Sequence, residues 1–246
     1  MRIILLGAKG IMGAHVINAA AKAGYEVCAL VDIKCDPNKE NEYTHISDVD
    51  KKADVIIDFS FHGVIGEVME YAVATATPVI VATTGHTEEE KSIISEASKK
   101  VATFYSGNMS VGIATLCNIV KKVVSVFPDA DVEIIETHHN RKLDAPSGTA
   151  NMLFSAVKEA REDAYANCGR HGICKRERNE VGISSIRVGN IVGIHEVIVG
   201  TASEQITLKH EAYDRALFAD GAIKAAEYMV GKGAGLYTMK ELLKNQ

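Results

Sequence analysis

A short segment of the chain gathers most of the side chains that can move protons near neutral pH. It runs from Glu136 to Thr149 and reads E-T-H-H-N-R-K-L-D-A-P-S-G-T. His138 and His139 can each accept or donate a proton at this pH, and Lys142 offers a cation and an acid. The Ser-Gly-Thr turn at its end opens a helical pattern, and the N–H groups of a helix start bind anions. The segment therefore predicts proton transfer beside a site for an anionic group.

Ordinary structural roles account for each of these side chains taken singly. His138 can be a hydrogen-bonded core histidine, Lys142 a solvated surface charge and Ser147 the N-cap of its helix. These roles do not explain why a cation, two titratable rings and a helix start occur within the twelve positions from 138 to 149. We therefore favour the functional interpretation.

Two sets of possible metal ligands are present, and we expect neither to hold a metal. Rings of adjacent histidines rarely converge on one ion, and the second set has no fourth ligand nearby, whereas closed zinc sites have four. The sets are His138, His139 and Asp144, and Cys168, His171 and Cys174. The five cysteines are odd in number and scattered, so we expect reduced thiols.

The elements expected before residue 108 alternate between short apolar runs and segments with helical spacing, as in parallel βαβ units. One helix follows the first strand, and another is predicted by the capping-box pattern at Thr87 and Glu90. The pattern of this half of the sequence predicts a doubly wound, Rossmann-type α/β sheet. The expected strands are Arg2 to Leu6, Glu26 to Val31, Ala53 to Asp58, Pro78 to Ala82 and Val101 to Tyr105.

A different pattern begins at residue 108. It predicts a long apolar helix to about residue 127, a strand from Asp131 to Glu136 that both histidines follow, and a helix from about Ser147 to Ala160. Three further strand-like runs suggest a mixed or antiparallel sheet, and hence an α+β domain. They are 181–187, 195–199 and 205–210, after which the pattern is helical again from residue 214.

A glycine-rich loop between the first strand and the first helix predicts dinucleotide binding. Residues 7–13 read G-A-K-G-I-M-G, and glycines there let N–H groups approach a pyrophosphate at the helix N-terminus. Asp32 closes the second strand, where an acidic residue binds ribose hydroxyls. Each of the other polar strand ends could be an ordinary loop, but together they are expected to line the nicotinamide half. They are Phe59-Ser60, Ala82 to Gly85 and Ser106 to Asn108.

The surroundings of Asp32 bear on the choice of cofactor. Its carboxylate favours NADH because it accepts hydrogen bonds from the ribose hydroxyls, whereas Lys9 and Lys34 can screen it and receive a 2′-phosphate. We expect the chain to use both NADH and NADPH, with NADH at least as effective.

Charge and composition argue against several classes of partner. The 246 residues carry a formal net charge of −5, which provides no basic surface for nucleic acid or anionic lipid. The chain begins directly on a strand-like run without a signal-peptide pattern, and no apolar run reaches transmembrane length. We expect a cytoplasmic protein with neither nucleic-acid nor membrane partners.

The chain resembles the 4-hydroxy-tetrahydrodipicolinate reductase (dihydrodipicolinate reductase) family of the diaminopimelate and lysine pathway. The family signature E-x-H-H-x-x-K-x-D-A-P-S-G-T-A is present as Glu136 to Ala150. It is accompanied by the N-terminal G-x-x-G-x-M-G, by T-T-G at 83–85 and by N-x-S-V-G at 108–112. Similarity continues through R-x-G-N-I-V-G-I-H at 187–195 and F-A-D-G-A at 218–222, so it covers essentially the whole chain.

The resemblance implies a reductase that transfers hydride from NADH or NADPH to a conjugated cyclic imine, a dicarboxylate. It implies that His138 donates or accepts a proton and that Lys142 donates one. A substrate carboxylate would be held by His139, Gly148 and Thr149. The implied cofactor contacts are Gly7, Ala8, Lys9, Gly10, Ile11, Met12, Asp32, Ala82, Thr83, Thr84, Ser106, Gly107, Asn108 and Met109.

The resemblance also implies a homotetramer assembled through the second domain. Under this resemblance, residues 1–107 and 213–246 are predicted to form the dinucleotide-binding domain, and residues 108–212 the substrate-binding and tetramerisation domain. Three places depart from the family pattern. Ala82 stands where glycine is common, Ser106-Gly107 where Ala-Pro is frequent, and Ile194 where glutamate is common.

Two other functions remain as alternatives. Another two-domain nicotinamide oxidoreductase, acting on an amino acid or a sugar, would share the first half but should lack H-H-x-x-K with P-S-G-T. A non-catalytic dinucleotide-sensing protein would bind NADH without oxidising it.

Overall fold

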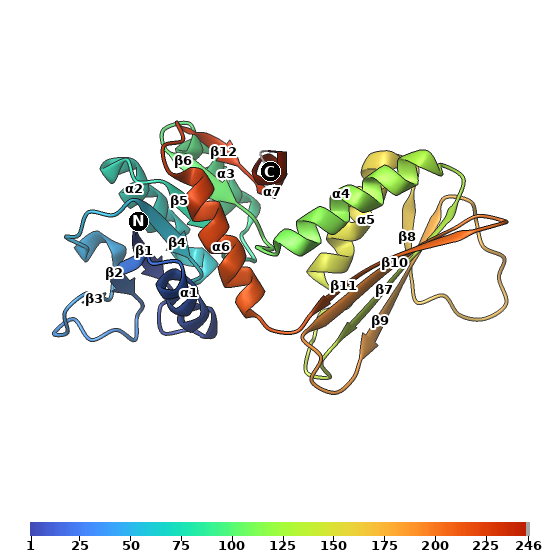
Figure 1. The fold of residues 1–246 in the computed structure, drawn as a ribbon, viewed down its shortest axis with the longest axis horizontal. Coiled ribbons are helices and arrows are strands. Elements are labelled where there is room, and N and C mark those ends of the chain that lie inside the picture. Colours follow the sequence, from blue (N-terminus) through green and yellow to red (C-terminus); the bar gives the residue numbers. More distant parts are fainter. Residues whose placement is uncertain (245–246) are drawn as a thin grey trace. The chain divides into compact units, whose positions relative to one another are not determined.

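Two compact units make up the protein in the computed structural model, which describes residues 1–244 (Figure 1). Met1–Val111 and Arg215–Gln246 form the first unit, and Gly112–Asp214 the second. The predicted domains divide after residues 107 and 212, whereas the units divide after residues 111 and 214. Each unit has its own hydrophobic core, as a domain does.

A parallel sheet of seven strands forms the centre of the first unit. The strands lie in the order β12-β6-β5-β4-β1-β2-β3, so the direction of winding reverses at β1, where doubly wound sheets bind ligands beyond the strand ends. Their bounds are β1 (Arg2–Leu6), β2 (Glu26–Val31), β3 (Glu42–Tyr43), β4 (Val55–Asp58), β5 (Val79–Val81), β6 (Ala102–Tyr105) and β12 (Gly235–Tyr237).

Helices cover both faces of this sheet (Figure 1). On one face the core joins Val68 of α2 and Ile94 of α3 to Ile4 and Ile56 of the strands, and on the other α1 packs beside α6. The predicted capping box is confirmed, because Thr87 and Glu90 exchange side-chain and backbone hydrogen bonds. The helices are α1 (Ile11–Lys22), α2 (Ile65–Thr75), α3 (Glu88–Ser98), α6 (Ala216–Met229) and α7 (Met239–Lys244), with short 3₁₀ turns η1 (Ile46–Asp48) and η2 (His62–Val64).

The second unit consists of a five-stranded mixed sheet with two helices on one face (Figure 1). Its order is β11-β10-β7-β9-β8; β10 is antiparallel to both of its neighbours, whereas β7, β9 and β8 are parallel. The elements are α4 (Val111–Val126), β7 (Asp131–His138), α5 (Gly148–Ala160), β8 (Tyr165–Cys168), β9 (Glu180–Arg187), β10 (Gly193–Gly200) and β11 (Gln205–Ala212). The mixed α+β arrangement agrees with the sequence-based expectation.

Alternate strand residues build the core of this unit, because successive side chains of a strand point to opposite faces. Val132 and Ile134 of β7 point to the buried face, and β9 and β10 contribute valines and an isoleucine in the same register. They pack against Val120 of α4 and Leu153 of α5.

The strand β7 corrects one expectation. His138 was expected to follow the strand, but β7 continues to His138, which pairs with Arg187 of β9. The side chain of His138 therefore shares the buried face with Glu136, and only His139 lies beyond the strand. The short strands β3, β8 and β12 were not predicted, since their sequences E-Y, Y-A-N-C and G-L-Y form neither an apolar run nor an alternating pattern.

Within the described residues, none of the helices combines the length and apolarity that a bilayer crossing requires.

Candidate active site

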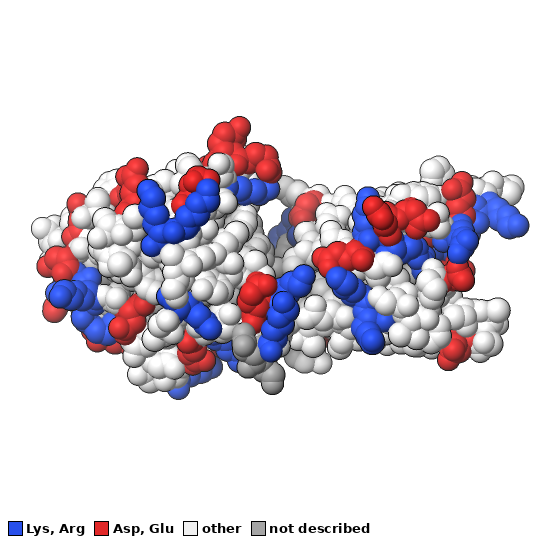
Figure 2. Space-filling view, turned by 90° about the horizontal axis from the view of Figure 1, so that it is seen from above, with Lys and Arg blue, Asp and Glu red and all other residues white. Residues whose placement is uncertain are grey.

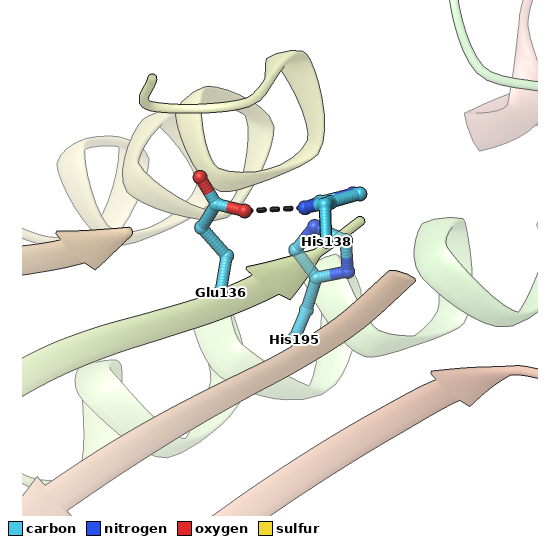
Figure 3. Close-up of side chains that lie close together, drawn as sticks. All are labelled: Glu136, His138 and His195. Atoms are coloured by element: carbon cyan, nitrogen blue, oxygen red, sulfur yellow. Dashed lines mark hydrogen bonds and ion pairs between the residues drawn. The ribbon is translucent and has the colours of Figure 1, made fainter. Parts of the chain in front are cut away.

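The buried face of the second sheet changes from apolar to polar at one end of its central strands. Glu136 and His138 continue the row of Val132 and Ile134 on β7, and His195 of β10 lies opposite Glu136. Figure 3 shows the carboxylate and the two rings gathered together. Arg187 of β9 pairs with His138, so three neighbouring strands bring their polar side chains to one place.

Glu136 is the centre of this cluster. Its side chain is 0% exposed, and each of its oxygens accepts a hydrogen bond from the guanidinium of Arg187, at 2.7 and 2.9 Å. The amide of Ser147 donates to Oε1 at 3.2 Å, and Nδ1 of His138 bonds to Oε2. Burial alone would raise the pKa of Glu136, but the bonds from Arg187, Ser185 and His138 lower it to about 2. Glu136 is therefore a carboxylate at neutral pH.

The bond to Glu136 fixes the state of the His138 ring. Because the carboxylate can only accept, Nδ1 of His138 must carry a hydrogen. Burial lowers the pKa of His138, against the opposing effect of Glu136, so the ring is predominantly neutral near pH 7. A neutral ring with hydrogen on Nδ1 leaves the lone pair on Nε2, which makes Nε2 the proton acceptor.

Ser147 links the cluster to the start of α5. Its hydroxyl oxygen accepts a hydrogen bond from the amide of Ala150 at 3.1 Å, which makes it the N-cap, and shares a hydrogen bond of 3.2 Å with Nε2 of His195. Burial and the nearby His138 lower the pKa of His195 to about 4, so this ring is neutral. Gly148 and Thr149 occupy the first turn of α5, where the helix dipole favours an anion.

Lys142 lies in the loop between β7 and α5. Its ammonium pairs with Asp144 Oδ1 at 2.7 Å, and this bond lowers the pKa of Asp144. Its charge also acts on the rings of His138 and His195, lowering the pKa of both. The loop is held at both ends, since the amide of His139 donates to Ile191 O at 2.8 Å and Arg187 donates to Asp144 O at 2.6 Å.

The ligand atoms of Glu136, His138 and His195 lie within 4.8 Å of one another, close enough for a metal ion. Arg187 already occupies both oxygens of Glu136, however, and a cation would have to displace its guanidinium from a fully buried carboxylate. Neither of the two sets named from the sequence forms such a cluster among residues 1–244. The polar cluster is therefore better suited to holding a proton than a metal.

The β1–α1 loop of the first unit has the shape of a phosphate cradle. Gly7 has a φ of +74°, and a Cβ on it would lie 2.4 Å from Phe59 O; one on Gly13 would lie 2.4 Å from Ala8 O. Gly10 is the N-cap of α1, and no side chain caps its first turn. A dinucleotide pyrophosphate fits these residues, because the uncapped amides face an anion with no Cβ in the way.

The other cofactor residues named from the sequence lie after strands β2, β5 and β6 of the same parallel sheet, at its carboxyl edge. Hydrogen bonds connect adjacent loops there: Thr83 and Ala82 donate to Asp58 O, and Ser106 N donates to Val81 O. The departure at Ser106-Gly107 is accommodated, because the Ser106 hydroxyl donates to Asn108 O at 2.7 Å and closes the turn.

Asp32 at the end of β2 is held by the backbone. The amide of Lys9 donates to Oδ2 at 3.1 Å and the amide of Lys34 to Oδ1 at 3.0 Å. The ammonium of Lys9, however, bonds to Glu42 Oε1 at 2.7 Å. The sequence analysis expected the Lys9 side chain to screen Asp32, but the carboxylate of Glu42 competes for the Lys9 ammonium.

Arg187, His195 and the anchoring role of Glu136 were not predicted from the sequence. Each lies on the core-facing side of a strand next to apolar residues of the same side: Glu136 follows Val132 and Ile134, Arg187 follows Val181 and Ile183 with Ser185 between, and His195 precedes Val197 and Val199. A charged residue in such an alternating row is the signal that could have identified them.

Two family models, one for each half of the same kind of enzyme, match the sequence of the chain. The model of the dihydrodipicolinate reductase N-terminus matches residues 1–109, and that of the C-terminus matches residues 112–243. A 4-hydroxy-tetrahydrodipicolinate reductase of Clostridium novyi is 43% identical over 249 residues, covering 100% of this chain and 99% of its own. The enzyme of that name from Caldanaerobacter subterraneus is 42% identical over 250 residues, covering 99% of this chain and 98% of its own.

Solved structures share the fold at low sequence identity. The dipicolinate-bound dihydrodipicolinate reductase from Paenisporosarcina sp. TG-14 has a TM-score of 0.82 at 22% identity and covers 97% of both chains. A probable dehydrogenase from Thermotoga maritima has a TM-score of 0.62 at 12% identity, covering 100% of this chain and 98% of its own.

Proposed function

The chain belongs to the dihydrodipicolinate reductase family, and we propose on this premise that it reduces 4-hydroxy-tetrahydrodipicolinate to tetrahydrodipicolinate in diaminopimelate and lysine biosynthesis. The observation that carries the proposal is the family signature at 136–150, folded so that His138 is bonded to a buried, ionised Glu136. The enzyme is an oxidoreductase with a dinucleotide-binding unit.

The cofactor is a pyridine nucleotide, and we propose that both NADH and NADPH serve, with NADH at least as effective. The reduced nicotinamide supplies a hydride when it is bound. The glycine-rich loop would hold the pyrophosphate and Asp32 the adenine ribose, while residues 82–84 and 106–109 would contact the nicotinamide half. Fixed backbone bonds to both oxygens of Asp32 support its role.

The chain supplies the proton chemistry. Loss of water from the 4-hydroxy substrate gives a conjugated imine, and hydride addition to this imine leaves an electron-rich intermediate that takes up one proton. Lys142 would donate this proton, since an ammonium has protons to give and no acceptor site. His138 would act through Nε2 as the proton acceptor, because its Nδ1 hydrogen is committed to Glu136.

A substrate carboxylate would be held by His139, Gly148 and Thr149. The first turn of α5 contains no acidic side chain, and its N-cap bond from Ser147 keeps the helix start in place. Charge-assisted bonds from this turn would orient the ring for the proton transfer.

We also propose a cytoplasmic homotetramer assembled through the second unit. The face of its sheet opposite the core carries Ile135, Ile194 and Ile198, which alternate with the core residues. Light scattering after size-exclusion chromatography tests this assembly. Nucleic acid and membrane are not expected partners, since acidic and basic side chains are interspersed on the face drawn in Figure 2 and the net charge is −5.

A coupled assay tests the reaction. Pyruvate, aspartate semialdehyde and the synthase that precedes this step generate the substrate, and the absorbance of NADH or NADPH is followed. Folded protein should consume the cofactor only when all components are present. Binding of NADH without consumption would instead favour the dinucleotide-sensing alternative, and consumption with an amino acid or a sugar would favour another oxidoreductase.

A further inference from the structure

A second carboxylate lies beside the expected ribose site of the first unit. Glu42 is in the edge strand β3, where it pairs with Leu30 of β2, two residues before Asp32. Its Oε1 accepts the ammonium of Lys9 at 2.7 Å, and its Oε2 accepts the amide of Asp36 at 2.9 Å. The Glu42 side chain is only 11% exposed, so both of its oxygens are held in one arrangement.

Lys9 thus connects the two carboxylates. Its backbone amide donates to Asp32 and its ammonium bonds to Glu42, while the charge of Asp32 also acts on the ammonium. The side-chain hydrogen bond from Lys9 lowers the pKa of Glu42, and the same bond raises the pKa of Lys9, so the pair is ionised at neutral pH. The charges of Asp32, Glu42 and Lys9 sum to about −1 at this site.

A 2′-phosphate would add a further charge of about −2 next to Asp32, where the ribose hydroxyls are expected. The nearest cation of the glycine-rich loop would already be engaged by Glu42. An unphosphorylated ribose meets no such repulsion, because its hydroxyls donate to Asp32. Lys34, whose amide also bonds to Asp32, and Lys39, whose charge acts on Glu42, are further cations nearby.

We propose that Glu42 determines the preference of this enzyme for NADH over NADPH, by holding the Lys9 ammonium away from the 2′-phosphate and by adding its own negative charge. The proposal rests on the proposed use of a pyridine nucleotide. It assigns discrimination to a residue that need not contact the cofactor.

Equilibrium binding tests this proposal. NADH and NADPH are titrated into the wild-type protein and into Glu42→Gln, with Kd measured by calorimetry. Glutamine keeps an acceptor for the Asp36 amide but has no charge to hold Lys9. NADPH should bind Glu42→Gln about tenfold more tightly than it binds the wild type, and NADH affinity should change less.

Two further variants separate this mechanism from a general charge effect. Glu40→Gln removes an exposed carboxylate from the same loop and should leave the NADH-to-NADPH affinity ratio as in the wild type. The double variant Lys9→Met with Glu42→Gln should lose the gain in NADPH affinity, because the released cation is gone. Glu42→Ala provides a second substitution should glutamine disturb the edge strand, and retained NADH binding reports folding.

The ratio of the two Kd values decides the outcome. A shift toward NADPH in Glu42→Gln that exceeds the shift in Glu40→Gln by about threefold or more, and that requires Lys9, supports the proposal. A smaller shift, or one that persists in the double variant, overturns it. No imine substrate is needed, so failure of the proposed reaction and failure of this inference give different results.

Discussion

The proposed proton site of the second unit and the dinucleotide site of the first are built from different parts of the chain. Side chains from three strands meet around Glu136, and its bonds from Ser147 and Arg187 come from residues 11 and 51 positions away in the chain. The dinucleotide site consists mainly of backbone: glycine turns, an uncapped helix start and two amides that hold Asp32. The first kind of site depends on strand register, whereas the second depends on a short local sequence.

The two sites also differ in how their charges are solvated. Glu136 is 0% exposed and its partner Arg187 is 18% exposed, whereas Glu42 is 11% and Lys9 33% exposed. Removing one partner of a buried pair leaves an uncompensated charge, while exposed pairs contribute little. Substitutions in the second unit should therefore affect stability and turnover together, and those around Asp32 should affect mainly cofactor choice.

The largest effect is expected from Arg187→Met. The carboxylate of Glu136 would remain buried without its guanidinium, at a cost of about 3–5 kcal/mol in the free energy of unfolding. Denaturant unfolding followed by circular dichroism measures it. Arg178→Met, which breaks the exposed pair with Asp129, is the matched control and should cost about 1 kcal/mol or less. Equal losses in the two variants would remove the distinction between buried and exposed charges.

The pH dependence of unfolding in acid should report the ionisation of the same carboxylate, Glu136. The pKa of Glu136 is about 2 in the folded protein, against 4.5 ordinarily, so its stabilising contribution is complete above pH 4.5 and is lost as the pH falls toward 2. The shift corresponds to about 3 kcal/mol. Unfolding measured from pH 6 to pH 2 should therefore be less steeply pH-dependent in Glu136→Gln than in the wild type. Glu204→Gln, in a loop of the same unit, should retain the wild-type slope; an unchanged slope in Glu136→Gln would contradict the assigned ionisation.

Lys142→Ala should lower turnover by about 10² or more, the scale of a lost general acid. The fold should persist, since Lys142 makes one ion pair with a half-exposed Asp144. The coupled assay supplies kcat and KM. Lys175→Ala, an exposed lysine of the same unit, should leave both unchanged. Turnover of the Lys142 variant within about threefold of wild type would remove Lys142 from the proton transfer.

The smallest expected effect distinguishes the N-cap of α5 from the N-cap of α3. Ser147→Ala and Thr87→Ala should each cost about 1 kcal/mol of stability, because each removes an N-cap. Only Ser147→Ala should also raise KM for the imine substrate, since Ser147 holds the turn that would bind its carboxylate. Parallel melting curves and kinetics compare them, and an equal change of KM in both variants would argue against a special role for the α5 start.

Local sequence predicted the parts of both sites that are contiguous in the chain. The glycine loop at 7–13, the capping box at Thr87 and the signature at 136–150 each fall within a single turn, loop or strand end. Residue types and spacing specify such features because the interactions that they need lie within a few residues. The end of β7 was misplaced by two residues, since pairing with β9, rather than local preference, extends the strand to His138.

The sequence by itself thus determined the fold class and the family, and it predicted the residues that are proposed to carry protons and phosphate. Only the tertiary structure decided what holds them: Arg187 lies 51 residues from Glu136, and His195 lies 48 residues from Ser147. It also showed that Glu42, 33 residues from Lys9, competes for that ammonium. Such partners are fixed by strand order and register, which arise from packing of the whole sheet and leave no local pattern in the chain.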